Sequence, residues 1–349
     1  MLNHERESPH AIAAPPAHPV PPAPPEVRVL AGDARARGRY ASLVAASPDA
    51  SVYHTLEWLD LFRAGGETLL FVAIGENAMA PFVCKGRGPL RRALSSPFDT
   101  YGGPISNESG ATASFGAMRR ALGVATARVV DFAGRVHAGD ESCTRLPART
   151  YIVDLMDGYA GASARYSDSN RRLIRQSSER GVTVAALAGA HEVPVFHRLY
   201  RRTMMRWRRP ERYGLAFFRA LYEAMVPHGL ATFTLAWKDG VAVGGNLVLW
   251  FRDQGYDWMW AYDDRRLHVR ATNALIDRAV RDAAARGAAS LNLGATPDAN
   301  EGSTRFKKSF GAAERDYTIY ASAAPPYAAA HILRQGARRI GASIRGLGG

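Results

Sequence analysis

The pattern of hydrophobic and polar positions predicts the same order of helices and strands twice along the chain. In the first half, apolar residues at positions 56, 59 and 62 have helical spacing, and Thr55 stands where it can cap that helix. The apolar segments FVAIG and MAPFVCK flank Glu76 and Asn77 and predict a β-hairpin. This half continues with a strand at 93–96, the Gly/Pro-rich loop SPFDTYGGP, a helix at 113–122 and a strand in RVVDFAG.

In the second half the pattern is more legible. A helix capped by Ser167 or Ser169 ends at Gly181, and the strand VTVAAL follows. Asp239 and Gly240 join two strands, because this pair tolerates the positive φ of a tight hairpin turn. The remaining elements are helices at 191–207 and 215–225, the strand YDWMWAY, the helix NALIDRAVRDAAARG capped by Thr272, and the strand SLNLG. The repeated order predicts an α/β (mixed α+β) protein built from a duplicated unit.

Length and composition agree with two globular domains. A chain of 349 residues, 47% of them hydrophobic, exceeds what one core usually serves. We expect a flexible Pro/Ala-rich tail at 1–26, domains at 27–150 and 151–325, and a basic tail at 326–349. The basic tail has an alternative interpretation as an amphipathic helix that contacts a membrane surface.

The two cysteines, Cys84 and Cys143, form no CxxC motif and have no nearby pair of histidines. This pattern indicates neither a disulfide framework nor a zinc site. No stretch resembles a signal peptide. We therefore expect a cytoplasmic protein without a bound metal.

The formal charge of +13 is concentrated in one region. Twelve arginines lie between Arg165 and Arg212, against four acidic residues. Guanidinium groups bind carboxylate and phosphate oxygens in pairs, so this region is a candidate surface for diphosphates, an RNA backbone or anionic lipid. Solvated helix faces are the alternative interpretation.

The most informative stretch is SLNLGATPDANEGSTRFKKSFG. A buried strand ends in it, a polar loop follows, and a lysine stands between two phenylalanines. The pattern resembles the C-terminal signature of the Fem-type aminoacyltransferases and the related double-GNAT acyltransferases, with their BioF2-like domain. In that family a D/N-x-G strand end leads through a short loop to FK-x-x-FG. The matching positions here are Asn292, Gly294, Phe306, Lys307, Phe310 and Gly311.

Other stretches resemble the same family, including YHTLEWLDLF, SPFDTYGGP, SNRRLIRQSSERGV and VAVGGNLVLW, so the likeness extends over roughly residues 40 to 320. The resemblance implies two tandem GNAT-like domains, each a mostly antiparallel sheet flanked by helices. It also implies an N-acyltransferase that joins an acyl or aminoacyl group, from acyl-CoA or aminoacyl-tRNA, to an amine of a polar acceptor. A precursor of the cell envelope or of an exopolysaccharide is the acceptor if the resemblance holds to that level.

Three residues are candidates for the chemistry. Lys307 offers a fixed positive charge for the oxyanion of acyl transfer, with a solvated lysine at a strand end as the alternative. Tyr101 and Tyr262 offer hydroxyls that orient an acceptor amine, with half-buried packing as the alternative.

The remaining candidates would bind substrate or donor. Arg270, Thr272 and Asn273 stand at a helix start that suits a donor pyrophosphate, although HVRATN replaces the usual Gly-rich phosphate loop and plain capping is the alternative. The candidates for substrate binding lie on two predicted helices and in the FK motif, with Glu57 also considered as a base: they are Phe306, Arg171, Arg172, Arg175, Glu57 and Trp58. Core packing or a solvated helix face is the alternative for each of them.

Motifs of other enzyme classes are absent from the sequence. It holds no Ser/His/Asp elbow, HExxH, Walker loop or Rossmann GxGxxG. The rival to group transfer is a non-catalytic GNAT pair that binds RNA or a sugar diphosphate through its arginines. The sequence leaves open the donor, the acceptor and the oligomeric state.

Overall fold

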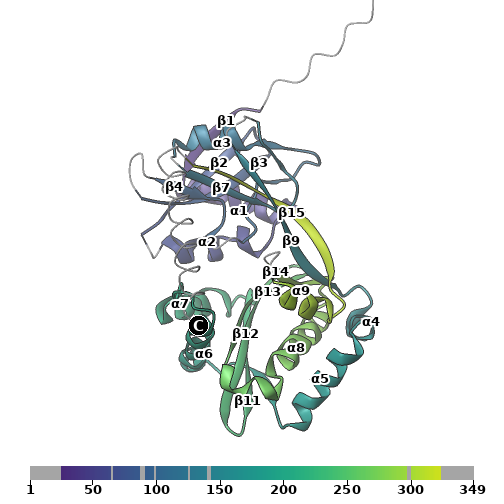
Figure 1. The fold of residues 1–349 in the computed structure, drawn as a ribbon. Helices are drawn as coiled ribbons and strands as arrows, with labels where there is room; N and C mark the ends of the chain where they lie inside the picture. The colour runs from purple at the N-terminus through teal and green to yellow at the C-terminus, as the bar shows by residue number, and fades with distance from the viewer. Residues whose placement is uncertain are drawn as a thin grey trace, which may run out of the picture.

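The computed structural model describes residues 25–63, 66–86, 91–97, 100–124, 126–139, 143–296 and 300–323. The predicted tails lie outside these ranges except for residues 25 and 26. Within the described residues, one continuous sheet of 13 strands runs through both halves, and helices cover its two faces (Figure 1). Its main order is β1-β2-β3-β4-β7-β15-β9-β14-β13-β12-β11-β10, and β5 pairs with β3.

The first half confirms the predicted hairpin and helix. Ile74 stands opposite Ala78 across the hairpin, and the Thr55 hydroxyl accepts from Trp58 N as a helix cap. The elements are β1 (Val27–Ala31), α1 (Ala34–Ala46), η1 (Val52–His54), α2 (Leu56–Arg63), β2 (Thr68–Ile74), β3 (Ala78–Lys85), β4 (Arg92–Leu94), β5 (Ile105–Ser106), β6 (Ala113–Ser114), α3 (Phe115–Leu122), β7 (Thr126–Asp131) and β8 (Val136–His137).

The second half follows the predicted order closely. Ser167 caps the basic helix by accepting from Asn170 N, and Asp239 and Gly240 form the hairpin turn with φ of 50° and 71°. The elements are β9 (Thr144–Asp154), α4 (Gly158–Ala164), α5 (Asp168–Glu179), β10 (Thr183–Ala186), η4 (Ala190–Glu192), α6 (Val193–Arg206), α7 (Leu215–Met225), β11 (Ala231–Lys238), β12 (Val241–Phe251), β13 (Gln254–Tyr262), η5 (Asp264–Val269), α8 (Ala271–Ala285), β14 (Ser290–Ala295), α9 (Glu301–Lys308) and β15 (Ala313–Ala323).

Two local predictions were wrong. Thr272 does not cap α8: the cap position belongs to Arg270, with φ of 62° and no side-chain hydrogen bond, because η5 turns directly into the helix. The stretch before Phe310 is not a loop with a strand-end lysine. It contains the helix α9, which Asn300 caps by accepting from Ser303 N. Eight largely polar residues carry too little apolar periodicity to show such a helix in advance.

The last described strand joins the two halves. β15 lies between β7 and β9, pairing with β9 from Ala313↔Ile152 onward and with β7 from Thr318↔Asp131 onward. In Figure 1, β9 and β15 form the long ribbon between the upper and lower parts of the molecule. The predicted domain boundary at 150/151 falls inside β9, so the division into 27–150 and 151–325 stays a prediction.

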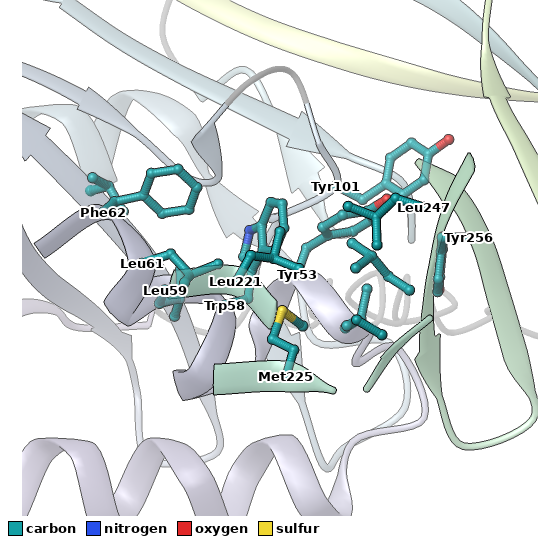
Figure 2. Packing of buried hydrophobic residues seen from close by; sticks show 14 of the residues in the cluster. Tyr53, Trp58, Leu59, Leu61, Phe62, Tyr101, Leu221, Met225, Leu247 and Tyr256 are labelled. Carbon is teal, nitrogen blue, oxygen red and sulfur yellow. The ribbon is translucent and has the colours of Figure 1, made fainter. Parts of the chain in front are cut away.

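The largest hydrophobic core also takes side chains from both halves (Figure 2). Trp58 of α2 lies at its centre with no exposed surface, and its ring meets Tyr53 at 5.3 Å and Trp258 of β13 at 5.1 Å. Leu221 and Met225 of α7 pack into the same cluster. Buried aromatic rings contribute large apolar areas, so the two halves are packed as one body.

A second core lies on the opposite face of the second-half sheet. There α8 buries Ile276, Val280 and Ala283 beside Val248 and Leu291 of the strands. Among the helices of the described ranges, none combines the length and the apolar character that crossing a bilayer requires.

Candidate functional site

The two parallel strands β13 and β14 separate partway along their length. They pair from Gln254↔Ser290 to Tyr256↔Asn292. Beyond that point β13 continues beside β12, where a register shift between Leu247 and Val248 adds a bulge, and β14 continues beside β9. Backbone groups that leave a ladder need other partners, so the opening between the strands is a place where a ligand can be held.

Lys307 of α9 fills the base of this opening. Its Nζ donates to Gly294 O at 2.7 Å and to Ala295 O at 3.0 Å, both at the end of β14. The side chain is buried, and Nζ lies 5.5 Å from the Tyr151 ring centre and 5.6 Å from that of Trp260. The alternative of a solvated lysine is therefore wrong.

Burial sets the protonation of Lys307. Loss of solvation lowers the pKa of the ammonium to about 8, and the nearby charge of Asp257 opposes that shift. Lys307 thus stays mostly protonated at neutral pH, although its ammonium form is less strongly favoured than that of an exposed lysine. A desolvated ammonium interacts strongly with an opposite charge that forms next to it.

Asp257 of β13 was missed in the sequence. It is buried, and its Oδ2 accepts from Trp260 Nε1 at 2.5 Å while its Oδ1 has no hydrogen-bond partner. Loss of solvation raises the pKa of this carboxyl to about 7, against the Trp260 hydrogen bond and the Lys307 charge, which lower it. An acid inside the apolar strand YDWMWAY was the available signal.

The FK-x-x-FG motif has a structural basis. Phe306 packs between Trp260, at 5.5 Å between ring centres, and Phe310, at 5.4 Å. Phe310 is fully buried against Tyr166. Gly311 has φ of 70°, and a Cβ there would stand 2.7 Å from Arg165 Cβ. These contacts hold α9 so that Lys307 points into the opening, while ligand contact by Phe306 stays a prediction.

The three residues predicted to bind donor phosphate lie together at the start of α8. The first helical bonds run from Asn273 N and Ala274 N to Arg270 O, so the amides of Ala271 and Thr272 have no partner within the helix. Asn273 is buried, and its Nδ2 donates to Asn170 Oδ1 at 2.8 Å, which ties α8 to α5. Arg270 is exposed and stays available to an anion.

Tyr101 belongs to a closed set of hydrogen bonds across the seam between the halves. Its hydroxyl donates to Thr150 Oγ1 at 2.9 Å, Thr150 Oγ1 donates to Asn292 Oδ1 at 2.6 Å, and Asn292 Nδ2 donates back to Tyr101 at 3.1 Å. Asn292 Oδ1 also accepts from Gly294 N at 2.8 Å. The Tyr101 hydroxyl has no proton left for an acceptor amine, so the geometry favours a structural role.

Several of the predicted site residues lie away from the lysine: among the described residues, no hydrogen bond, ion pair or ring contact joins them to Lys307. Glu57 is exposed on α2 and Trp58 is buried in the shared core. Tyr262 ends β13 with its ring 6.3 Å from that of Trp207. The arginines of α5 are exposed: Arg171 pairs with Asp168 at 2.6 Å, Arg175 with Glu179 at 3.7 Å, and Arg172 faces solvent.

A pocket of about 360 Å³ opens beside α9. Its wall includes Tyr151, whose ring also meets the Lys307 ammonium, and the cations Arg149, Arg305 and Lys308. A larger pocket, of about 530 Å³, lies farther along the β9–β15 ribbon and shares Arg149. Through Tyr151, the smaller pocket lies within one aromatic ring of the buried lysine.

Comparisons with known proteins identify a domain in the second half and a shared fold over most of the chain. Residues 163–308, which contain the strand opening and Lys307, match the model of the acetyltransferase (GNAT) domain. No curated protein matches the chain at a significant level.

Solved structures match over most of the chain. The crystal structure of FemX is 12% identical with a TM-score of 0.61, over 81% of this chain and 95% of that one. The C-terminal domain of a putative lysylphosphatidylglycerol synthetase from Agrobacterium fabrum is 14% identical with a TM-score of 0.55, over 86% and 95%. L-PGS from Bacillus licheniformis is 11% identical with a TM-score of 0.52, over 81% and 90%.

Identities this low show a shared fold, and the match to the family model identifies the domain at residues 163–308. The resemblance expected from Asn292, Gly294 and the FK-x-x-FG motif is therefore confirmed for the fold, and for a GNAT domain in the second half. Residues 163–308 match the acetyltransferase (GNAT) domain, and the chain as a whole shares its fold with FemX.

Proposed function

We propose that this protein is an N-acyltransferase that moves an acyl or aminoacyl group from acyl-CoA or aminoacyl-tRNA to an amine of a polar acceptor. The observation that carries the proposal is the buried Lys307 ammonium at the opening between β13 and β14. It stands inside the matched GNAT domain, which also contains the start of α8, a helix start that suits phosphate.

The chemistry needs few protein groups. The acceptor amine attacks the carbonyl carbon of the donor ester or thioester, and negative charge develops on the carbonyl oxygen. The C–O or C–S bond of the donor then breaks, and the departing alcohol or thiol takes up the proton that the amine loses. An ammonium already desolvated and held in place stabilises that charge without reorganisation of solvent. The role proposed for Lys307 is this stabilisation, and Arg270 with the first turn of α8 would hold the phosphate groups of the donor.

The pocket beside α9 is the proposed place for the acceptor. Arg149, Arg305 and Lys308 line it together with Glu301 and Glu314, a mixed set that suits an amine-bearing molecule with a carboxylate or phosphate. A precursor of the cell envelope or of an exopolysaccharide has this character. One structural neighbour is named a putative lysylphosphatidylglycerol synthetase, which supports an acceptor of the envelope.

The alternative is a GNAT pair that binds without catalysis. The exposed arginines of α5 favour it, because Arg172 and Arg175 offer charge to an RNA backbone or a sugar diphosphate. In that case the protein would have no turnover to lose, and substitution of Lys307 would change at most its affinity for the ligand.

The test is to incubate purified protein separately with acetyl-CoA, longer acyl-CoAs and a pool of charged tRNA, and to measure thermal shift and loss of donor. Each positive result is repeated with Lys307→Met and with the control Lys85→Met, whose lysine is exposed in the first half and pairs with Glu67 at 3.0 Å. Turnover of one donor that Lys307→Met abolishes and Lys85→Met retains supports the transferase. Tight binding of RNA or nucleotide sugars without any turnover contradicts it.

A further inference from the structure

Asn246 of β12 is a buried amide without hydrogen bonds. Its side chain is 1% exposed, and neither its Oδ1 nor its Nδ2 has a partner. It stands opposite Trp260 in the ladder, and strand alternation places it on the same face as Val248. That face carries the core around α8, where Trp260 and Phe306 also pack.

Asp257 adds a second unpartnered group on this face. Its Oδ1 has no partner although the residue is only 4% exposed. The Asn246 amide is close enough to favour the carboxylate form but makes no hydrogen bond of ordinary geometry with it. Buried polar atoms are nearly always hydrogen-bonded, so three unpartnered atoms on two neighbouring residues need an explanation.

Gly294 locates these groups at the strand opening. With φ of 77°, a Cβ at this position would point to within 3.9 Å of Asp257 O and 4.0 Å of Lys307 Nζ. The backbone angle accounts for the glycine, and the two contacts place Gly294 between β13 and the lysine. The groups facing the pair are Asn246 from β12, Trp260 from β13, Tyr151 from β9 and the β14 carbonyls that Lys307 binds.

We propose that Asn246, Asp257 and Lys307 form one polar subsite for the carbonyl group of the transferred acyl chain. Asn246 and Lys307 donate hydrogen bonds to the carbonyl oxygen, and Asp257 is a positioning residue that keeps Lys307 in its ammonium form. The assignment of the ligand rests on the proposed function, whereas the coupling of Asp257 to Lys307 does not.

The coupling follows from the surroundings of the lysine. Burial favours the neutral amine, and a carboxylate beside it favours the ammonium. A neutral amine would offer a much weaker field to a developing oxyanion. Asp257→Asn removes the negative charge while keeping the shape of the side chain, so the lysine should lose its proton at lower pH.

The first test measures this in the ligand-free full chain. Its only lysines are at positions 85, 238, 307 and 308, so NMR of protein labelled with ¹³C at lysine Cε resolves Lys307, with Lys307→Arg for assignment. Asp257→Asn should lower the Lys307 midpoint by at least about one pH unit. The exposed Asp253→Asn is the control and should leave it unchanged. An unshifted Lys307 in Asp257→Asn overturns the pairing.

The second test separates a ligand group from a structural one. Asn246→Leu removes a buried amide that makes no hydrogen bond of ordinary geometry and only favours the carboxylate form of Asp257, so the unfolding temperature should rise, while turnover of the donor found among acetyl-CoA and charged tRNA should fall at least about tenfold. A fall in unfolding temperature, or a rise with turnover intact, overturns the subsite. If none of the donors is consumed by the unsubstituted protein, the proposed function fails, and the lysine titration still decides the coupling.

Discussion

Two buried polar clusters flank β14, and they differ in how completely their hydrogen bonds are made. On one side, Tyr101, Thr150 and Asn292 form a closed ring in which each hydroxyl and amide has a partner. On the other, Asn246 and Asp257 beside Lys307 leave three atoms without one. A satisfied network rigidifies a fold, whereas an unsatisfied one costs stability unless a ligand completes it. The contrast separates what holds the two halves together from what we propose they act on.

The largest effect is expected from Lys307→Met, which tests whether the two clusters differ in function. If the unsatisfied cluster is the site of transfer, turnover should fall by roughly 10² to 10³, the usual cost of removing one oxyanion donor. Lys85→Met in the first half should keep turnover close to that of the unsubstituted protein. Steady-state assays with the identified donor measure both, and equal rates for the two variants would contradict the role of Lys307.

The next-largest effect is expected in the pH dependence of turnover. Lys307 must carry its proton, so activity should be lost as pH rises through about 8. As pH falls, Asp257 takes up a proton near pH 7, but Lys307 then stays protonated without the carboxylate, so this pair gives no loss of activity on the acid side. The expected profile is level below about pH 7 and falls about tenfold per pH unit above about 8. A rate that is flat from pH 6 to 9 would show that the protonation of Lys307 does not control turnover.

Substitution in the cluster of Tyr101, Thr150 and Asn292 should instead change the stability of the fold. Thr150→Val leaves the buried hydroxyl of Tyr101 and the amide of Asn292 each short of a partner, so the free energy of unfolding should fall by about 1–3 kcal/mol. Urea unfolding measures this. Thr126→Val is the matched control, because its hydroxyl has no partner to lose. Loss of turnover in a fully folded Thr150→Val protein would mean that this cluster also serves the reaction.

The smallest effect is expected on α5. Arg172→Ala with Arg175→Ala removes exposed charges, one of them in a surface pair at 3.7 Å, so the free energy of unfolding should change by less than about 1 kcal/mol. Thermal and urea unfolding check this. A weaker affinity for charged tRNA in this variant, with a smaller salt dependence, would identify α5 as a contact for the RNA backbone.

Much of the fold could be predicted from local chemistry. The hairpins at Glu76-Asn77 and Asp239-Gly240, the caps at Thr55 and Ser167, and the order of elements in each half follow from spacing and turn residues. The helix α9 and the capping of α8 by Arg270 could not, because a short polar helix and a left-handed arginine leave no periodic signal.

The candidate site divides in the same way. Lys307 was identified by a motif whose glycine and phenylalanines turn out to orient its helix. Asp257 and Asn246 were not, since an acid or amide within an apolar strand has no meaning until the facing groups are known. Tyr101 was assigned to chemistry because its hydroxyl partners, Thr150 and Asn292, come from distant strands.

By itself the sequence determined the class of fold and indicated the GNAT domain of the second half, because these depend on spacing and on side chains that stand close together along the chain. Only the tertiary structure decided which polar groups are paired. It did so where β13 and β14 separate and where β15 closes the sheet of the first half, because burial and hydrogen bonding there depend on residues far apart in sequence.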